Sequence, residues 1–413
     1  MTKKLTTKKT VLADQLEDQL VKLFLECEEE PSDLEIDLGK TEFIEIASLS
    51  FLISFWLGRQ IRQKKTSFIR LPQKQKTRDF LKLWRFIEAL ASATRTPEQE
   101  ILPESEKAFL EEPITTYTGS KTGLYALELN NSWKKTYSGN RNFFEFKSFI
   151  VDDLDNRDLF RSGTEALPKN ESMRWQGELI KAVLRTHLSG GAEEEDEVAR
   201  VVIFESLANA IQHPAASIIQ KTSIFLGDTK ENGYIKEGHL TICVWDDGES
   251  IIDTLAPIVR SGGIIRAYSL PSPMYDRTKM IVKKYGKTEK FSQLIRSAED
   301  PAQDAANEWI LLSSTFPGLT RKVAKNVSKV DKLSDEEQQD QYRMGFGLYA
   351  LKRTVVDLYG GSLSIRSKNC FLNLTLAPKN LKVRYKASVM LYPEKIYPEF
   401  VGNLIIMRIP IKR

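Results

Sequence analysis

Polar side chains spaced four residues apart can form a continuous stripe on one face of a helix. The segment "FESLANAIQH" places Glu205, Asn209 and His213 at this spacing within an otherwise apolar run. Because four residues turn an α-helix by about 400°, the three side chains would lie along the same face. Such a stripe either faces water, as in many amphipathic helices, or faces a ligand as part of a site.

Two glycine-containing patterns further along the chain could complete such a site. "TICVWDDGES" is an alternating strand that ends at Asp246 and is followed by Gly248, a pattern that is also typical of an ordinary turn. "RMGFGLYALKRTVVDLYGG" places Gly345 and Gly347 before an amphipathic helix that a double glycine ends. The amide groups and dipole at such a helix start favour an anion. Each pattern alone is weak evidence for a binding site.

The order of the three patterns is more specific than any one of them. Over about residues 171–413, the chain resembles the GHKL superfamily of ATP-binding domains, which includes gyrase B, Hsp90, histidine kinases and MutL. The resemblance implies an α/β sandwich in which helices cover one face of a mixed sheet. It also implies ATP and Mg²⁺ as cofactors, and a lid or insertion at about residues 260–340.

The resemblance further implies a role for each matched residue. Glu205 matches the general base, which activates water in the ATPases or polarises the acceptor hydroxyl in the serine kinases, and Asn209 matches the Mg²⁺ ligand. Asp246 matches the aspartate that accepts a hydrogen bond from the adenine amino group. The other matched nucleotide-binding positions are Gly248 beside the base, and His213, Gly345, Gly347 and Leu348 on the phosphate side.

Two positions depart from the family pattern, and three functions stay open. Ser250 stands where a second glycine is usual after Asp246, and Tyr349 stands where a small residue is usual. The principal prediction is a Mg²⁺-dependent ATPase that acts as a nucleotide-driven switch on a protein partner. The alternatives are a serine/threonine kinase of the anti-sigma-factor partner-switching type, and an ATP-sensing scaffold with little or no turnover.

The N-terminal block, residues 1–112, alternates strand signals with helical ones and so indicates an α/β layer. "LEIDL" and "SFIRL" predict strands, "SLSFLISFWLGRQIRQ" predicts a helix, and "TRDFLKLWRFIEAL" predicts a single helix capped by Thr77. Over about residues 30–95, this block resembles a STAS domain, the fold of anti-sigma-factor antagonists. Ile46 stands where those proteins carry a phosphorylated serine, and Ser48 is expected to cap the helix.

The STAS-like block is interpreted as a docking module for a protein partner, or as an α/β cap without a signalling role. Residues 113–170 are expected to form a joint with short strands, and residues 171–413 the GHKL-type domain. The sequence leaves a homodimer open.

Composition limits the class of protein. With 60 basic against 56 acidic residues, the charge is too balanced to indicate a nucleic-acid binder. The basic excess over residues 277–332 makes nucleic-acid contact the weaker interpretation of that stretch. The three cysteines include no CxxC pair, so a zinc site is not expected. Their small number fits a reducing, cytoplasmic setting. No apolar run reaches the about 20 residues of a membrane span.

Overall fold

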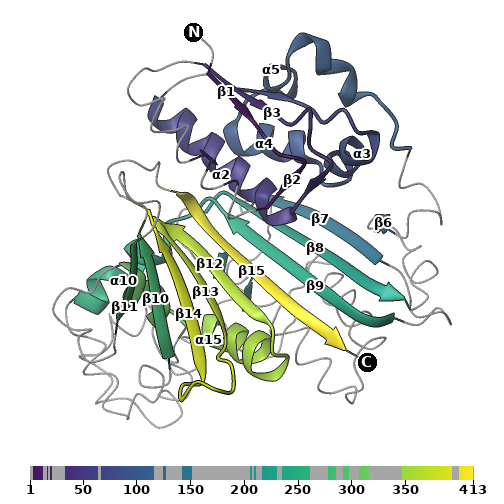
Figure 1. Ribbon diagram of the computed structural model, residues 1–413. Coiled ribbons are helices and arrows are strands. Elements are labelled where there is room, and N and C mark those ends of the chain that lie inside the picture. The colour runs from purple at the N-terminus through teal and green to yellow at the C-terminus, as the bar shows by residue number, and fades with distance from the viewer. Residues whose placement is uncertain are drawn as a thin grey trace.

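The chain folds as a mixed α/β protein with a small parallel sheet followed by one large mixed sheet (Figure 1). None of the helices in the described part of the chain has both the length and the apolar character needed to cross a membrane. The computed structural model describes residues 3–12, 16, 19–20, 33–63, 67–115, 124–126, 142–150, 205–206, 209–210, 216–229, 235–260, 278–284, 292–296, 307–315, 347–392 and 400–412.

The N-terminal block contains a three-stranded parallel sheet in the order β1-β3-β5, and a separate parallel pair, β2 and β4. The strands are β1 (Lys3–Thr6), β2 (Thr10–Val11), β3 (Leu34–Asp37), β4 (Phe43–Ile44) and β5 (Ser67–Arg70). The helices are α2 (Ile46–Gln63), α3 (Gln75–Leu83), α4 (Phe86–Thr94), α5 (Glu98–Ile101) and the 3₁₀ helix η1 (Glu104–Leu110). The strands predicted from "LEIDL" and "SFIRL" and the long helix between them are confirmed.

Two details of the N-terminal prediction are wrong. The expected single helix is divided into α3 and α4 at Arg85, whose φ is 55°, and Thr77 lies inside α3 with its hydroxyl donating to the Glu42 carbonyl at 2.8 Å. Ser48 lies inside α2, and its hydroxyl donates to the Val11 carbonyl at 3.2 Å rather than capping the helix. Both hydroxyls have tertiary partners, which local sequence does not reveal.

The large sheet has ten described strands in the order β11-β10-β14-β13-β12-β15-β9-β8-β7-β6. Its strands are β6 (Leu124–Ala126), β7 (Asn142–Ile150), β8 (Ile218–Thr229), β9 (Ile235–Asp246), β10 (Thr278–Lys284), β11 (Ser292–Arg296), β12 (Ser362–Lys368), β13 (Cys370–Leu376), β14 (Tyr385–Leu391) and β15 (Phe400–Lys412). The pairs β10–β14 and β6–β7 are parallel and the others antiparallel. The sheet is therefore mixed, and β6 and β7 from the expected joint extend it.

In the larger region, the described helices with defined bounds are α10 (Ile251–Arg260), α12 (Asn307–Ser313), α15 (Gly347–Lys352) and the π-helical η4 (Arg353–Leu358), and the described residues 205–206 and 209–210 are also helical. Two segments within the stretch expected as a lid or insertion belong to the sheet and the core. β10 pairs in parallel with β14, and every residue of α12 is buried. The lid or insertion over 260–340 stays a prediction, because β10 and α12 are only part of this range and most of the remaining stretch lies outside the described residues.

Both faces of the large sheet are covered. On β9, Ile242 and Val244 belong to the core that contains α10, α12 and α15, whereas Cys243 and Trp245 belong to a second core with the N-terminal block. This alternation is the period-2 pattern of a strand buried on both faces. Helix α2 lies against β15 and β9 on the second face (Figure 1). The Phe51 side chain of α2 is buried in that second core. The predicted sandwich had helices on one face, and the N-terminal block supplies the cover for the other.

Candidate functional site

The start of α15 lies directly against the polar stripe of "FESLANAIQH". A Cβ atom placed on Gly347 would lie 2.8 Å from both Oδ1 and Nδ2 of Asn209, and 3.0 Å from Oε2 of Glu205. No side chain larger than that of glycine fits there without moving these groups. The fold thus brings together two segments that are far apart in the sequence.

Glu205 and Asn209 are half-buried, while their neighbours Ser206 and Ala210 are fully buried. At these two positions the stripe therefore does not face open water. The Asn209 Nδ2 atom is buried and has no hydrogen-bond partner among the described residues. An unpaired buried polar atom costs about 1–3 kcal/mol, which a suitable ligand would recover. The NH2 group of an asparagine amide can donate to a phosphate oxygen, and its oxygen can bind a hard metal ion. Because a 180° rotation of the amide exchanges the two atoms, Asn209 suits either ligand.

Asp246 ends β9 in the same alternation as Ile242 and Val244, on the face of the sheet that α10, α12 and α15 cover, and only 3% of its surface is exposed. Its Oδ1 accepts hydrogen bonds from the Gly248 amide at 3.0 Å and from Asn403 Nδ2 at 3.1 Å. No donor within the described ranges binds its Oδ2. Burial raises the pKa of Asp246 to about 7, although the two hydrogen bonds act in the opposite direction. A buried carboxylate with a perturbed pKa and a spare acceptor is a binding-site candidate.

The turn after Asp246 is tight and gives its two carboxylates different tasks. A Cβ on Gly248 would lie 3.0 Å from Asp246 Oδ1 and 3.1 Å from the Ala216 Cβ, so a small residue is required there. Asp247 accepts a hydrogen bond from the Ile218 amide at 2.9 Å and so ties the turn to β8. Asp247 therefore closes the turn, and the Asp246 carboxylate lies on the face of the sheet that α10, α12 and α15 cover.

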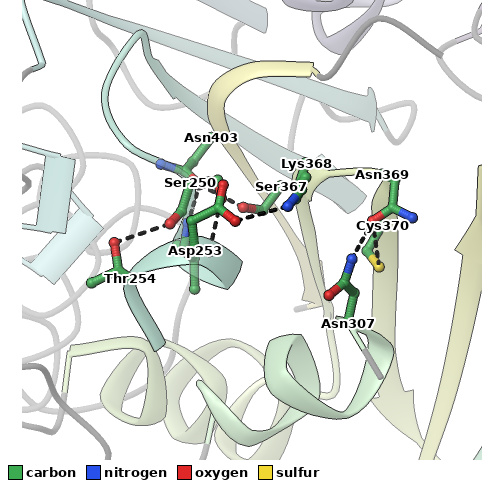
Figure 2. A network of polar contacts seen from close by, with 10 residues as sticks. Ser250, Asp253, Thr254, Asn307, Ser367, Lys368, Asn369, Cys370 and Asn403 are labelled. Carbon is green, nitrogen blue, oxygen red and sulfur yellow. Dashed lines mark hydrogen bonds and ion pairs between the residues drawn. The ribbon is translucent and has the colours of Figure 1, made fainter. Parts of the chain in front are cut away.

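Asn403 is the residue of this site that sequence reasoning missed. It is buried on β15 directly opposite Asp246. Its Nδ2 donates to Asp246 and to the Glu249 carbonyl at 3.0 Å, and its Oδ1 accepts from the Ile251 amide at 2.9 Å. The same Oδ1 accepts from Ser367 Oγ at 2.8 Å (Figure 2). This side chain therefore fixes the Asp246 carboxylate and the loop that leads into α10. An asparagine directly after a glycine in the apolar run "VGNLIIMRIP" was the available signal.

Ser250, the first departure from the GHKL pattern that the sequence resembles, lies directly before α10. Its Oγ accepts from the Asp253 amide at 2.9 Å, as an N-cap serine does, and donates to Asp253 Oδ2 at 2.7 Å (Figure 2). Lys368 also binds the Asp253 carboxylate at 2.8 Å. Compared with glycine, Ser250 has less backbone freedom but stabilises the start of α10 through these bonds. The hydrogen bonds of Asp246 to Gly248 and Asn403 are present alongside them.

Tyr349, the second departure, belongs to a buried cation network. The Lys352 ammonium lies 4.9 Å from the Tyr349 ring centroid and 3.1 Å from the Tyr385 hydroxyl, with Asp357 at 3.4 Å. Burial lowers the pKa of Lys352, and Asp357 opposes this shift. The partly buried Leu348 packs against the core of the large sheet. These contacts anchor α15 to β14 and so hold Gly347 in place.

Two predicted site residues, His213 and Gly345, lie outside the described residues, as does most of the basic stretch 277–332. Comparisons of the chain with protein-family models, curated proteins and solved structures find no match. The assignment of the site therefore depends on the residues and their geometry.

Proposed function

We propose that the chain binds ATP with Mg²⁺ and hydrolyses it, and that this cycle switches a protein partner. The contact of Gly347 with Glu205 and Asn209 carries the proposal. It places the N-terminal end of α15, which attracts anions, beside the Glu205 carboxylate and the Asn209 amide. Carboxylate and amide oxygens are ligands for hard metal ions such as Mg²⁺. Helix α15 continues directly into η4, so this start belongs to a helical segment of residues 347–358.

The donor and acceptor set fits a purine nucleotide and a hard cation. The spare Asp246 Oδ2 suits an exocyclic amine, because an amine donates where a carboxylate accepts. The buried, unpaired amide of Asn209 suits a phosphate–metal group. Gly248 and Gly347 let the backbone approach the Asp246 carboxylate and the Glu205 and Asn209 side chains closely, because a Cβ at either position would crowd these groups. When bound, Mg²⁺ supplies neutralisation of the phosphate charge.

Each side chain then has a separate task. Asp246 selects the amine-bearing base, and a donor bound to its carboxylate favours the ionised form. Asn209 orients the phosphate end. Glu205, half-buried beside Gly347, takes the proton of the attacking water. The alternative, a kinase activity, would require a serine or threonine on a separate protein as its substrate. Within this chain, Ile46 at the position of the phosphorylated serine lacks a hydroxyl, and Ser48 is fully buried.

The test compares phosphate release by the parent chain, Glu205→Gln and the control Glu249→Gln, which alters an exposed carboxylate next to the Asp246 turn. Loss of a general base commonly costs about 10²- to 10⁴-fold in rate, so Glu205→Gln should bind ATP as the parent does and release almost no phosphate. Glu249→Gln should match the parent.

The same assay distinguishes the alternatives. Phosphate that appears on a serine or threonine of a separate STAS protein, instead of in solution, would replace the ATPase proposal with the kinase. A parent chain that binds ATP without either reaction, and that Glu205→Gln leaves unchanged, would be a sensor. Failure of the parent to bind ATP would refute all three.

A further inference from the structure

Strand β15 is irregular at its start, next to the Asp246 site. Ser367 of β12 pairs with Asn403, but the next residue, Lys368, pairs with Phe400. Two extra residues, 401 and 402, therefore form a bulge in β15. Bulges displace backbone polar groups from the sheet ladder, so these groups need other partners.

The N-terminal block supplies those partners. The Ser54 hydroxyl on α2 donates to the Val401 carbonyl at 3.1 Å and accepts from the Val401 amide at 2.9 Å. The Trp245 indole also donates to the Val401 carbonyl at 3.1 Å. Ser54 is fully buried. One serine of the first block thus binds both backbone polar groups of a residue in the large sheet.

The rest of the bulge lies on the backbone of Asp246. Gly402 has a φ of 78°, and a Cβ on it would lie 1.6 Å from the Asp246 carbonyl oxygen. The next residue, Asn403, binds the Asp246 carboxylate. Three consecutive residues therefore connect the Ser54 hydroxyl to the side chain that would select the base.

We propose that Ser54 is a positioning residue for the base end of the site, and that the N-terminal block regulates nucleotide binding through it. The inference rests on the proposed function. The block is held on the sheet by further contacts, including the Arg408–Glu45 ion pair at 2.6 Å and the Phe51 ring at 5.5 Å from the Phe400 ring. A protein that binds the block and shifts α2 would therefore alter the bulge.

Linkage makes this control reciprocal. If a partner on the N-terminal block weakens nucleotide binding by a given factor, the nucleotide weakens partner binding by the same factor. The block is then the input of the switch, and the bulge is the element that both ligands bias.

The test compares Ser54→Ala with Ser48→Ala in the full chain. Both serines are fully buried on α2, but the Ser48 hydroxyl donates to Val11 within the N-terminal block. Hydrogen exchange without nucleotide reports the site directly, because the Gly248 amide donates to Asp246 and the Ile251 amide donates to Asn403.

Ser54→Ala removes both hydrogen bonds to Val401 and should speed exchange of these two amides by at least about three- to tenfold, the effect commonly seen for a single lost hydrogen bond, while Ser48→Ala leaves them unchanged. Ser54→Ala should also weaken binding of adenosine and of Mg-ATP by a similar factor, with no change in binding of tripolyphosphate. Unchanged exchange in Ser54→Ala, or equal acceleration in both variants, would overturn the inference.

The two proposals fail separately in this experiment. A parent chain that does not bind Mg-ATP would refute the proposed function, and the exchange of Gly248 and Ile251 would still decide whether Ser54 positions this loop. If the parent binds Mg-ATP and Ser54→Ala changes neither the exchange of Gly248 and Ile251 nor nucleotide binding, only the positioning role of Ser54 is refuted.

Discussion

Asp246→Asn should make the protein more stable at alkaline pH while it weakens nucleotide binding. The substitution keeps the shape of the side chain, and the remaining carbonyl oxygen can still accept from Gly248 and Asn403. It removes the charge that burial disfavours in the folded state. A residue that costs stability and is needed for binding has a functional rather than a structural role.

The magnitude follows from the pKa of Asp246. A rise from 3.8 to about 7 corresponds to about 4 kcal/mol of unfolding free energy, at about 1.4 kcal/mol per unit. Because the folded pKa is the higher one, the folded state holds the proton longer, and stability falls as pH rises from about 4 to about 7. The new buried amide nitrogen of the variant offsets about 1–3 kcal/mol of the gain. A net stabilisation of about 1–3 kcal/mol is expected above neutral pH.

Urea denaturation of parent and variant at several pH values tests this reasoning, because all other titrating groups cancel in the difference. Between about pH 5.5 and about pH 8.5, the stability advantage of Asp246→Asn should grow by about 2 kcal/mol. ATP affinity should rise with pH in the parent relative to the variant, since a donor ligand prefers the ionised carboxylate. A difference that stays constant with pH, or a parent that is the more stable protein at about pH 8.5, would refute it.

Substitutions at Gly402, Gly347 and Ser250, with two controls, test the glycine and capping contacts. Gly402→Ala should cost about 2–5 kcal/mol of unfolding free energy, because the Cβ would meet the Asp246 carbonyl at 1.6 Å. The control Gly360→Ala, with φ of 62° and no atom within 4 Å, should cost only about 1 kcal/mol. Equal costs of the two substitutions in urea titrations would contradict the close approach. Gly347→Ala should weaken Mg-ATP binding by about 1–3 kcal/mol in calorimetric titrations, and an unchanged affinity would remove this position from the site. Ser250→Ala should lower the unfolding free energy by about 1 kcal/mol and Ser250→Gly by only a few tenths, so an Ala variant as stable as the parent would show that the cap contributes nothing.

Periodic sequence signals predicted several elements of the N-terminal block. The alternation in "LEIDL" and the apolar face of "SLSFLISFWLGRQIRQ" were enough for β3 and α2, because each depends on neighbours in the sequence. The same reasoning failed at Thr77 and Ser48, whose hydroxyls bind carbonyls of distant segments. It also did not anticipate that α2 would cover the second face of the large sheet, since an alternating strand does not reveal which element packs on each face.

The candidate site was predictable where it depended on the order of patterns. Glu205, Asn209 and Gly347 were grouped by resemblance, and the structure brings them into contact. Asn403 was not predictable in this way, because its task depends on its pairing with Asp246 across the sheet. Ser54 depends on the bulge in β15 and on the packing of a different block, both of which arise only in the tertiary structure.

The most direct test of the central claim is the Mg²⁺ dependence of ATP binding by the full chain and by Asn209→Ala. If Asn209 and Gly347 hold the phosphate–metal end while Asp246 holds the base, the parent should bind ATP more tightly with Mg²⁺ than without it. Asn209→Ala should lose most of that difference and retain the weaker binding seen without metal. Absence of ATP binding by the parent, or the same Mg²⁺ effect in both proteins, would contradict the account.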